Sequence, residues 1–150
     1  MYEICYLLAT TKNAHSLIID YGENHGFSDS IRGIKNQRLF KGNDILNFSG
    51  QCDLSSYVNF KALMKVAYSY PNLKIGGFIT QSFFLEYLQI ANRMKMLQET
   101  TTDMKKKKIL ERQYQKLVGE NEMGNTFKVF YVHKINNKPV YPFLDEILNQ

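Results

Sequence analysis

The residues best suited to chemistry in this chain are acids, arginines and a tyrosine that follow its first apolar run. They are Asp20, Tyr21, Arg32, Arg38 and Asp53. Carboxylates at a cleft can accept hydrogen bonds from a cationic substrate or act as a general base. Arginines can bind a carboxylate with two parallel hydrogen bonds, or they can hold a loop in place by pairing with its acids. A plainer alternative is that Arg32 and Asp53 form an ion pair that only fixes the loop.

The element that must position these residues is a strand over residues 16–19. Its unbroken apolar run stops abruptly at Asp20, Tyr21 and Gly22. Such a run predicts a strand covered on both faces, as in a parallel α/β sheet. Ligands collect beyond the carboxyl ends of parallel strands, so Asp20 and Tyr21 are expected at the rim of a cleft. Gly22 would let the backbone turn away. This pattern favours a small-molecule or group-transfer site.

A long polar segment over residues 23–56 follows that strand, and a short helix over residues 3–9 precedes it. Loops of more than about 12–15 residues inside a compact domain are usually functional or disordered. Scattered aromatics and arginines allow this one to pack. It is therefore expected to be an ordered loop that covers the site, with a floppy insertion as the alternative.

The rest of the chain reads as alternating helices and strands. Asn59 is expected to cap a helix over residues 60–68. Gly76-Gly77, in a strand over residues 73–80, indicates a bulge or a close approach of another backbone. The other expected elements are a helix capped by Ser82 and running to about Leu97, a basic helix ending at Val118 before Gly119, a strand over residues 127–133, and a closing helix over residues 141–148. The two later strands are expected to pair at a sheet edge. The fold class is α/β.

Composition places further bounds on the chain. A length of 150 residues predicts one domain, and no apolar run approaches the ~18 residues of a membrane span. The formal net charge is +5, with its local concentration at Lys105–Lys108. That run is typical of a solvated helix face; an anion-binding patch is the alternative. The aromatics fall at core positions and not beside these lysines, so nucleic acid is not an expected partner.

Several common chemistries have no matching pattern. Cys5 is expected to be an inert core thiol and Cys52 a free thiol in a loop, and neither has the spacing of a metal site. His15 and His133 are expected to be structural. Gly22-x-x-x-Gly26 lacks the spacing of a nucleotide loop.

The first eleven residues lack the marks of a targeting peptide and read as the end of a helix, so the chain is expected to begin part-way through a larger domain.

Five short motifs occur in order along the chain. They are Ile19-Asp20-Tyr21-Gly22, then Ile31-Arg32-Gly33 followed by Arg38, then Asp53-Leu54-Ser55-Ser56-Tyr57-Val58-Asn59-Phe60, then Thr80-Gln81-Ser82-Phe83-Phe84-Leu85, then Met123-Gly124-x-x-Phe127. Taken together, they resemble the MidA-like family of S-adenosylmethionine-dependent methyltransferases. The resemblance extends from about Glu3 to Val132. No single motif is specific, but the succession is. The family includes the mitochondrial protein-arginine methyltransferase needed for respiratory complex I assembly.

The chain departs from the family pattern at four positions. Gln37 replaces a histidine, Ser55 a threonine, Asn59 an aspartate and Ser82 a glycine. Ser55 keeps a hydroxyl and Asn59 remains a good helix cap, so neither change threatens the fold. The change at Gln37 puts a proton-transfer role at that position in doubt.

The resemblance implies that the chain is the C-terminal part of a Rossmann-like methyltransferase sheet, with its fifth strand, a substrate-side loop and two closing strands. Asp20 and Asp53 would then hold a substrate guanidinium and Tyr21 would position it. The implied substrate-side residues are Gly22, Arg32, Gly33, Arg38 and Gln81.

The family's glycine-rich cofactor loop and ribose-binding acid have no counterpart in these 150 residues. S-adenosylmethionine is thus implied for the full-length family and is not expected to bind this chain alone. The resemblance also implies a protein substrate, a respiratory-complex subunit, and a mitochondrial location. The alternative is a non-catalytic interaction module that binds a partner or a second copy through an exposed sheet edge.

Overall fold

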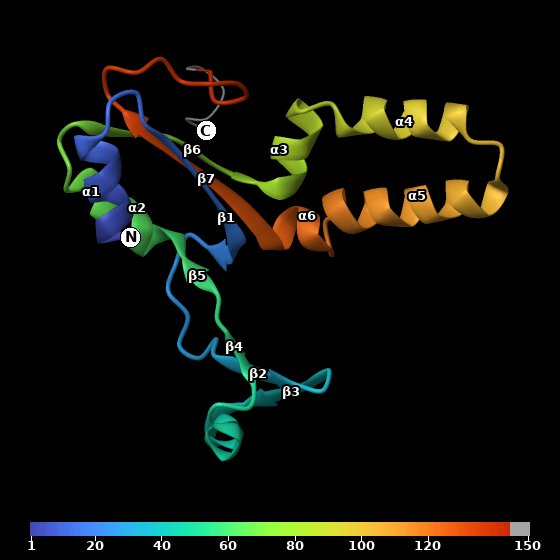
Figure 1. The fold of residues 1–150 in the computed structure, drawn as a ribbon, viewed down its shortest axis with the longest axis horizontal. Helices are drawn as coiled ribbons and strands as arrows, with labels where there is room; N and C mark the ends of the chain where they lie inside the picture. Colours follow the sequence, from blue (N-terminus) through green and yellow to red (C-terminus); the bar gives the residue numbers. More distant parts are fainter. Residues whose placement is uncertain (145–150) are drawn as a thin grey trace.

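The centre of the molecule is a mixed sheet with the strand order β5-β1-β7-β6. The computed structural model describes residues 1–144. β7 runs antiparallel to both of its neighbours, whereas β5 pairs with β1 in parallel, at Gly22 and Glu23 (Figure 1). The strands are β1 (His15–Glu23), β5 (Val58–Asn59), β6 (Leu73–Thr80) and β7 (Phe127–Lys134).

The first strand corrects the expectation of a parallel strand covered on both faces. β1 pairs along most of its length with the antiparallel β7. Leu17 and Ile19 each remain 46% exposed, while Ile18, which points to the opposite face, packs against the core. A run of three apolar residues does not by itself reveal whether one or both faces of a strand are covered, because that depends on neighbours distant in sequence.

One face of the sheet is covered by α1 (Tyr2–Thr10) and α2 (Phe60–Tyr68). Phe60, Phe130 and Val132 are fully buried between the layers. Cys5 is buried there as well, and burial raises the pKa of its thiol, as expected for an inert core cysteine. The predicted cap of α2 is confirmed, because the Ala62 amide donates to Asn59 Oδ1 at 3.1 Å.

The predicted pairing of the two later strands is also confirmed. β6 and β7 are antiparallel neighbours, with a register shift between Ile75 and Gly77 that marks the expected bulge. A Cβ at Gly76 would lie 2.3 Å from the ring of Tyr131. The bulge therefore needs glycine because the Tyr131 ring occupies the space that any side chain would take.

The region after β6 is a run of helices: α3 (Gln81–Tyr87), α4 (Ile90–Thr100), α5 (Met104–Val118) and α6 (Met123–Thr126). α4 and α5 form a hairpin that extends sideways from the sheet (Figure 1). Thr80, and not Ser82, caps α3 through the Phe83 amide. The expected single helix to Leu97 is interrupted at Gln89, which has a positive φ of 64°. The predicted end of α5 at Val118 is confirmed.

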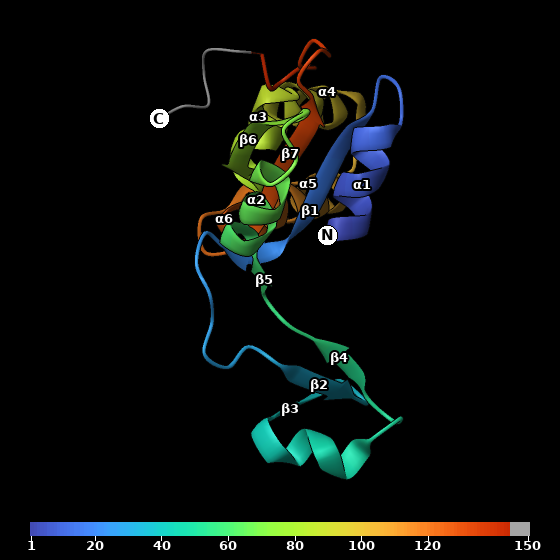
Figure 2. The same cartoon turned by 90° about the vertical axis from the view of Figure 1, so that its left-hand side faces the viewer.

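The polar segment expected to be a loop contains a small second sheet. It comprises β2 (Arg32–Lys35), β3 (Arg38–Lys41), the 3-10 helix η1 (Gly42–Phe48) and β4 (Asp53–Ser55), in the strand order β3-β2-β4. We call residues 32–55 the β lobe. It projects away from the main sheet (Figures 1 and 2). Asn36 and Gln37 form its hairpin turn with positive φ values of 50° and 62°, a conformation most often signalled by Asn-Gly.

The helix expected from Tyr141 does not begin there. Residues 141–144 form a turn and irregular backbone, and Phe143 is buried against Tyr131. Pro142 disfavours the helical conformation at the residue before it. The remainder of the expected helix, residues 145–148, lies outside the described residues.

Candidate functional site

A hollow of about 290 Å³ lies at the carboxyl end of β1. Its lining comes from the end of β1, the start of the segment toward the β lobe, the approach to β5, and α6. The lining residues are Gly22, Glu23, Phe27, Tyr57, Asn125 and Thr126. We call it the β1-end pocket. The expectation of a cleft beyond this strand is thus met in position, although the strand's main partner is antiparallel.

Close backbone packing brings these segments together. A Cβ at Gly22 would lie 2.1 Å from the Val58 carbonyl oxygen, so only glycine lets β5 pair with the end of β1. On the other side, a Cβ at Gly124 would lie 2.3 Å from the backbone of Val118. Glycine there allows α6 to follow α5 closely and to present Asn125 and Thr126 to the pocket.

An ion pair lies at the wall of the pocket. Lys128 of β7 is 5% exposed, and its Nζ donates to Glu23 Oε1 at 2.9 Å and to the Asn125 carbonyl oxygen. A buried ammonium needs such partners, because desolvating it alone costs several kcal/mol. Glu23 remains partly open to solvent, with 42% of its side chain exposed. The pocket therefore offers a carboxylate oriented by a buried lysine.

Aromatic rings also line the pocket. The Tyr57 ring lies 4.9 Å from Phe27 and 5.3 Å from Tyr21, measured between centroids. The Arg32 guanidinium carbon lies 4.6 Å from the centre of the same Tyr57 ring, within the range of a cation–π contact. Tyr57 thus joins the β lobe to the end of β1.

The structure brings part of the predicted constellation together. Tyr21, Gly22 and Arg32 meet around Tyr57 and the β1-end pocket. Asp20 is next to them, but its Oδ1 accepts a hydrogen bond from the Tyr21 amide at 2.8 Å and it does not line the pocket.

The other predicted residues lie elsewhere. Arg38 and Asp53 are exposed on the β lobe, and within the described chain no ion pair links Arg32 to Asp53. Gly33 is buried in the lobe, where a Cβ would lie 3.2 Å from Cys52 Sγ. Gln81 is 8% exposed and donates to the Leu117 carbonyl oxygen at 2.8 Å, so it ties α3 to the end of α5.

Sequence reasoning missed Glu23, Lys128 and Tyr57. A signal existed for one of them, since Lys128 interrupts the apolar strand over residues 127–133, where a charged residue facing the core must have a partner. Glu23 and Tyr57 carry no such signal. Both lie in polar segments, and only the folded chain brings them to the same pocket.

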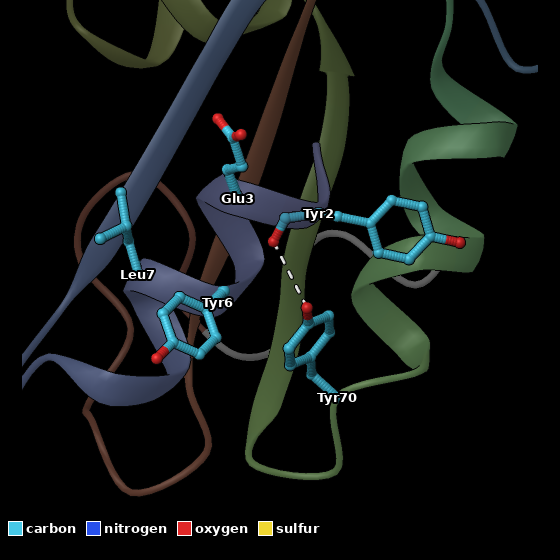
Figure 3. A pocket seen from close by; sticks show the side chains of 5 residues that line it. All are labelled: Tyr2, Glu3, Tyr6, Leu7 and Tyr70. Atoms are coloured by element: carbon cyan, nitrogen blue, oxygen red, sulfur yellow. Dashed lines mark hydrogen bonds between the residues drawn. The ribbon is translucent and has the colours of Figure 1, made fainter.

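A second hollow, of about 440 Å³, lies beside α1 and is lined by Tyr2, Glu3, Tyr6, Leu7 and Tyr70. Figure 3 shows Tyr6 and Tyr70 side by side, with the Tyr70 hydroxyl donating to the Tyr2 carbonyl oxygen at 3.3 Å. Glu3 is its single ionisable group apart from the tyrosines. We call it the α1 groove. It offers an apolar surface but little that could catalyse a reaction.

The described residues do not form a cradle for a nucleoside cofactor. Such a cradle uses glycines to let the backbone approach the ligand. Here the spaces beside Gly22, Gly76 and Gly124 are filled by Val58, Tyr131 and Val118 of the chain itself. The open space at Gly42 and Gly50 belongs to the first residue of η1 and to a turn of the β lobe. Among residues 1–144, Gly22, Gly76 and Gly124 therefore leave no backbone cradle of this kind for S-adenosylmethionine.

The fold and site define a mixed α/β protein whose candidate pocket lies at a strand end. The sequence matches the model of a family described as "Putative S-adenosyl-L-methionine-dependent methyltransferase" over residues 3–79, just over half of the chain. The chain belongs to this family, and the family resemblance predicted from its motifs is confirmed.

Similar proteins agree with this assignment. The chain is 32% identical over 117 residues to protein arginine methyltransferase NDUFAF7, mitochondrial, of Xenopus tropicalis, an alignment that covers 78% of this chain and 26% of the relative. It is 29% identical over 128 residues to the Homo sapiens protein of that name, with coverages of 85% and 28%. The chain therefore spans about a quarter of the length of these relatives.

Two solved structures from Burkholderia thailandensis share the fold. One superposes with a TM-score of 0.73 at 20% identity, covering 87% of this chain and 36% of the other. The second, which has S-adenosyl-homocysteine bound, gives a TM-score of 0.71 at 20% identity and covers 97% and 36%. Among residues 1–144, no helix is long and apolar enough to cross a membrane.

Proposed function

We propose that this chain is the substrate-side part of an S-adenosylmethionine-dependent protein-arginine methyltransferase. The family match and the names of the relatives support this activity. The strand order β1-β7-β6, with the middle strand antiparallel, is the C-terminal part of a Rossmann-like sheet in this proposal. The cofactor-binding part lies outside these 150 residues. By the same likeness the substrate is a respiratory-complex protein, and the protein acts in complex I assembly in the mitochondrion.

The observation that carries the proposal is the pairing of a carboxylate with aromatic rings in the β1-end pocket. An arginine side chain is a flat cation, which a carboxylate binds through two hydrogen bonds and aromatic faces bind through cation–π contact. Glu23 supplies the carboxylate, and Tyr57 and Phe27 supply the rings. Methyl transfer chiefly requires alignment of the nucleophile with the methyl group, so a site that fixes the guanidinium performs the main task on this side.

The residues predicted from sequence have supporting roles in this proposal. Asp20 fixes the backbone at Tyr21, and Tyr21 supports the Tyr57 ring. Asp53 and Arg38 lie exposed on the β lobe, where they contact charged groups of the substrate chain away from the methylated arginine.

The test is a nuclear magnetic resonance titration of the chain with an arginine-containing peptide. We expect shifts at Gly22, Tyr57 and Thr126, and none with the same peptide carrying the neutral analogue citrulline. Glu23→Gln should weaken binding at least tenfold. Its amide oxygen can still accept a hydrogen bond from Lys128, but the buried lysine loses its counter-charge, so circular dichroism must first show that the variant is folded. The matched control is Glu3→Gln in the α1 groove, which should change nothing. Shifts confined to the α1 groove, or equal binding of both peptides, contradict the proposal.

A separate measurement tests the proposal that the cofactor-binding part lies outside these 150 residues. Calorimetry of the chain with S-adenosylmethionine should show no tight binding, because atoms of the chain itself fill the space beside Gly22, Gly76 and Gly124. Micromolar binding by residues 1–150 alone would overturn this part of the proposal.

The second candidate function is a non-catalytic interaction module derived from the same fold. The free edge of β1 favours it, because such an edge can pair with another strand, including that of a second copy. The arginine-peptide titration discriminates between the two, since an interaction module has no need to distinguish arginine from citrulline.

A further inference from the structure

The α4–α5 hairpin concentrates the positive charge of the chain. Residues 90–118 contain eight basic and three acidic side chains, a net charge of +5 that equals the formal net charge of the whole chain. The hairpin extends sideways from the sheet and is joined to it through α3 and α6 (Figure 1). A surface of this charge attracts negatively charged partners and repels a second copy of itself.

The lysine run at the start of α5 is unfavourable for the helix that contains it. Lys105–Lys108 lie in its first turn, which has no acidic residue. Positive charges near a helix N-terminus oppose the helix dipole, and neighbouring like charges repel. Asp103 accepts hydrogen bonds from the Lys105 and Lys106 amides at 2.8 and 3.4 Å, but one acid does not balance four lysines. Local rules are usually broken where a protein binds something.

An apolar slot of about 150 Å³ lies between α4 and α5. We call it the hairpin slot. Its aliphatic and methionine side chains are Ile90, Met94, Leu97, Leu110 and Leu117. Leu97 and Leu117 remain 41% and 37% exposed. Ile90 and Leu97 are seven residues apart, which is about two turns or ~10 Å along α4. The slot therefore suits apolar side chains spaced one turn apart, as an amphipathic helix presents them.

Basic side chains lie beside the hairpin slot. Arg93 lines it. Lys106 precedes Leu110 by four residues, so it lies on the same side of α5. Within residues 1–144, the side chains of Arg93 and Lys106 form no hydrogen bond or ion pair. Glu86, by contrast, accepts a hydrogen bond at 2.9 Å from Tyr114, another slot residue. The slot thus combines an apolar floor with two cations that are free to bind acids.

We propose that the hairpin slot binds an amphipathic helix of a partner protein, whose apolar side chains enter the slot and whose acidic side chains pair with Arg93 and Lys106. The charge of the hairpin favours an acidic partner over a second copy of this chain. The hollow shape favours a polypeptide over a lipid bilayer, because a bilayer is bound by apolar side chains that project into it. This interaction does not involve arginine binding, so it stands apart from the proposed function.

The test is fluorescence anisotropy of the whole protein with three short, labelled helical peptides. The first has glutamates on one face and two leucines one turn apart on the other. The second replaces the leucines with alanine, and the third replaces the glutamates with lysine. We expect the first to bind at least tenfold more tightly than either of the others, and less tightly as salt is added. Equal binding of the first two peptides, or no binding, overturns the proposal.

Two double variants separate the slot from the charge of the hairpin as a whole. Arg93→Glu/Lys106→Glu should weaken binding of the first peptide at least tenfold. Lys95→Glu/Lys108→Glu makes the same change in net charge and should weaken it less than threefold. Each of these control lysines is two positions from a slot residue, a rotation of about 200° around its helix. Equal losses would mean that net charge alone attracts the peptide, and would overturn the proposal.

A single substitution tests the apolar part of the slot. Leu97→Gln should weaken binding of the first peptide at least tenfold, whereas Met96→Gln, at the adjacent and 65% exposed residue, should not. If Leu97→Gln loses helix content by circular dichroism, the two double variants still decide the matter. Vesicles containing phosphatidylserine and polyuridylate represent the other anionic partners. Affinity for either one that matches that of the first peptide and depends on Leu97 would assign the slot to a membrane or to RNA and overturn the proposal.

Discussion

The main sheet is mixed and the small sheet of the β lobe is antiparallel, and the two regions are stabilised in different ways. The main sheet buries Phe60, Phe130 and Val132 completely between its strands and helices. In the β lobe η1 contributes no buried residue, and Leu46 and Leu54 are 74% and 66% exposed. Its contacts include a Phe40–Phe48 pair with centroids 4.5 Å apart, Lys35 Nζ at 4.5 Å from the centre of the Phe48 ring, a Lys35–Gln51 hydrogen bond and the Arg32–Tyr57 contact.

This difference indicates that the two regions differ in stability. Regions with few buried apolar contacts open at a low free-energy cost, whereas core strands open only with global unfolding. The main sheet therefore determines stability and fixes Glu23 and Lys128. The β lobe contacts the end of β1 through Tyr57, and we expect it to open at a lower free-energy cost than the main sheet, which suits the substrate-side role proposed for it.

The largest contrast is expected from truncating one phenylalanine in each region. Phe130→Ala should lower the free energy of unfolding by about 3–5 kcal/mol, because it leaves a cavity in the core. Phe40→Ala in the β lobe should lower it by less than about 1 kcal/mol, since its half-buried ring can be lost by local opening. Urea unfolding monitored by circular dichroism measures both. Equal losses would show that the lobe and the sheet unfold as one unit.

The next largest loss of stability is expected where the main sheet joins the β lobe, at Gly22 and β5. Gly22→Ala places a methyl group 2.1 Å from the Val58 carbonyl oxygen and should cost about 2 kcal/mol, the usual cost of overpacking. Hydrogen exchange should increase at Val58 and Asn59 and throughout the lobe, while β7 stays protected. Gly26→Ala is the matched control, because its nearest neighbour is the end of the Asn59 side chain at 3.1 Å. Unchanged exchange in Gly22→Ala would show that β5 does not anchor the lobe.

Tyr131→Phe probes a polar contact inside the main sheet. The Tyr131 hydroxyl lies 2.7 Å from His15 Nδ1 and accepts a hydrogen bond from the Val140 amide at 3.3 Å. Removing the Tyr131 hydroxyl should lower the free energy of unfolding by about 1.5 kcal/mol at neutral pH. Burial raises the pKa of Tyr131 above its usual value, so the folded state holds this proton more tightly. The contribution of this group to the free energy of unfolding is fully present below the pKa of tyrosine in the unfolded chain, about 10. It is lost as the pH rises through the higher pKa of Tyr131 in the folded state.

The check is the urea midpoint of the wild type and Tyr131→Phe between pH 8 and 11. The variant should lose less stability over this range than the wild type does. Tyr68→Phe serves as the control, because Tyr68 is 74% exposed. If the urea midpoints of all three proteins fall in parallel as the pH rises, the loss of stability does not come from Tyr131.

The smallest effect is expected at the cap of α2, immediately after β5. Asn59→Ala removes the acceptor of the Ala62 amide and should cost about 1 kcal/mol. Asn59→Asp, which restores the aspartate of the family pattern, should keep the stability because its carboxylate also caps the helix. A loss in Asn59→Asp as large as in Asn59→Ala would mean that the side chain acts through another contact.

Most of the main-sheet elements could be predicted from sequence, and the β lobe could not. β6, β7 and α2 have local signals, namely a bulge glycine, an apolar strand pattern and the Asn59 cap. The lobe strands have three or four residues each, too short for a periodic pattern, and their hairpin turn uses Asn36-Gln37 without a glycine. The candidate site was predicted at the end of the first strand, where the β1-end pocket lies, and the acid that lines this pocket is Glu23 and not Asp20.

The sequence by itself determined the family, the helices and strands with local signals, and the position of the pocket after the first strand. Each of these depends on residues close together along the chain. Only the tertiary structure decided which face of β1 is open, which edge has no strand partner and which carboxylate faces the pocket. Those features depend on pairs such as Glu23 and Lys128, which are 105 residues apart. No local pattern contains such contacts, because they form only when the whole sheet assembles.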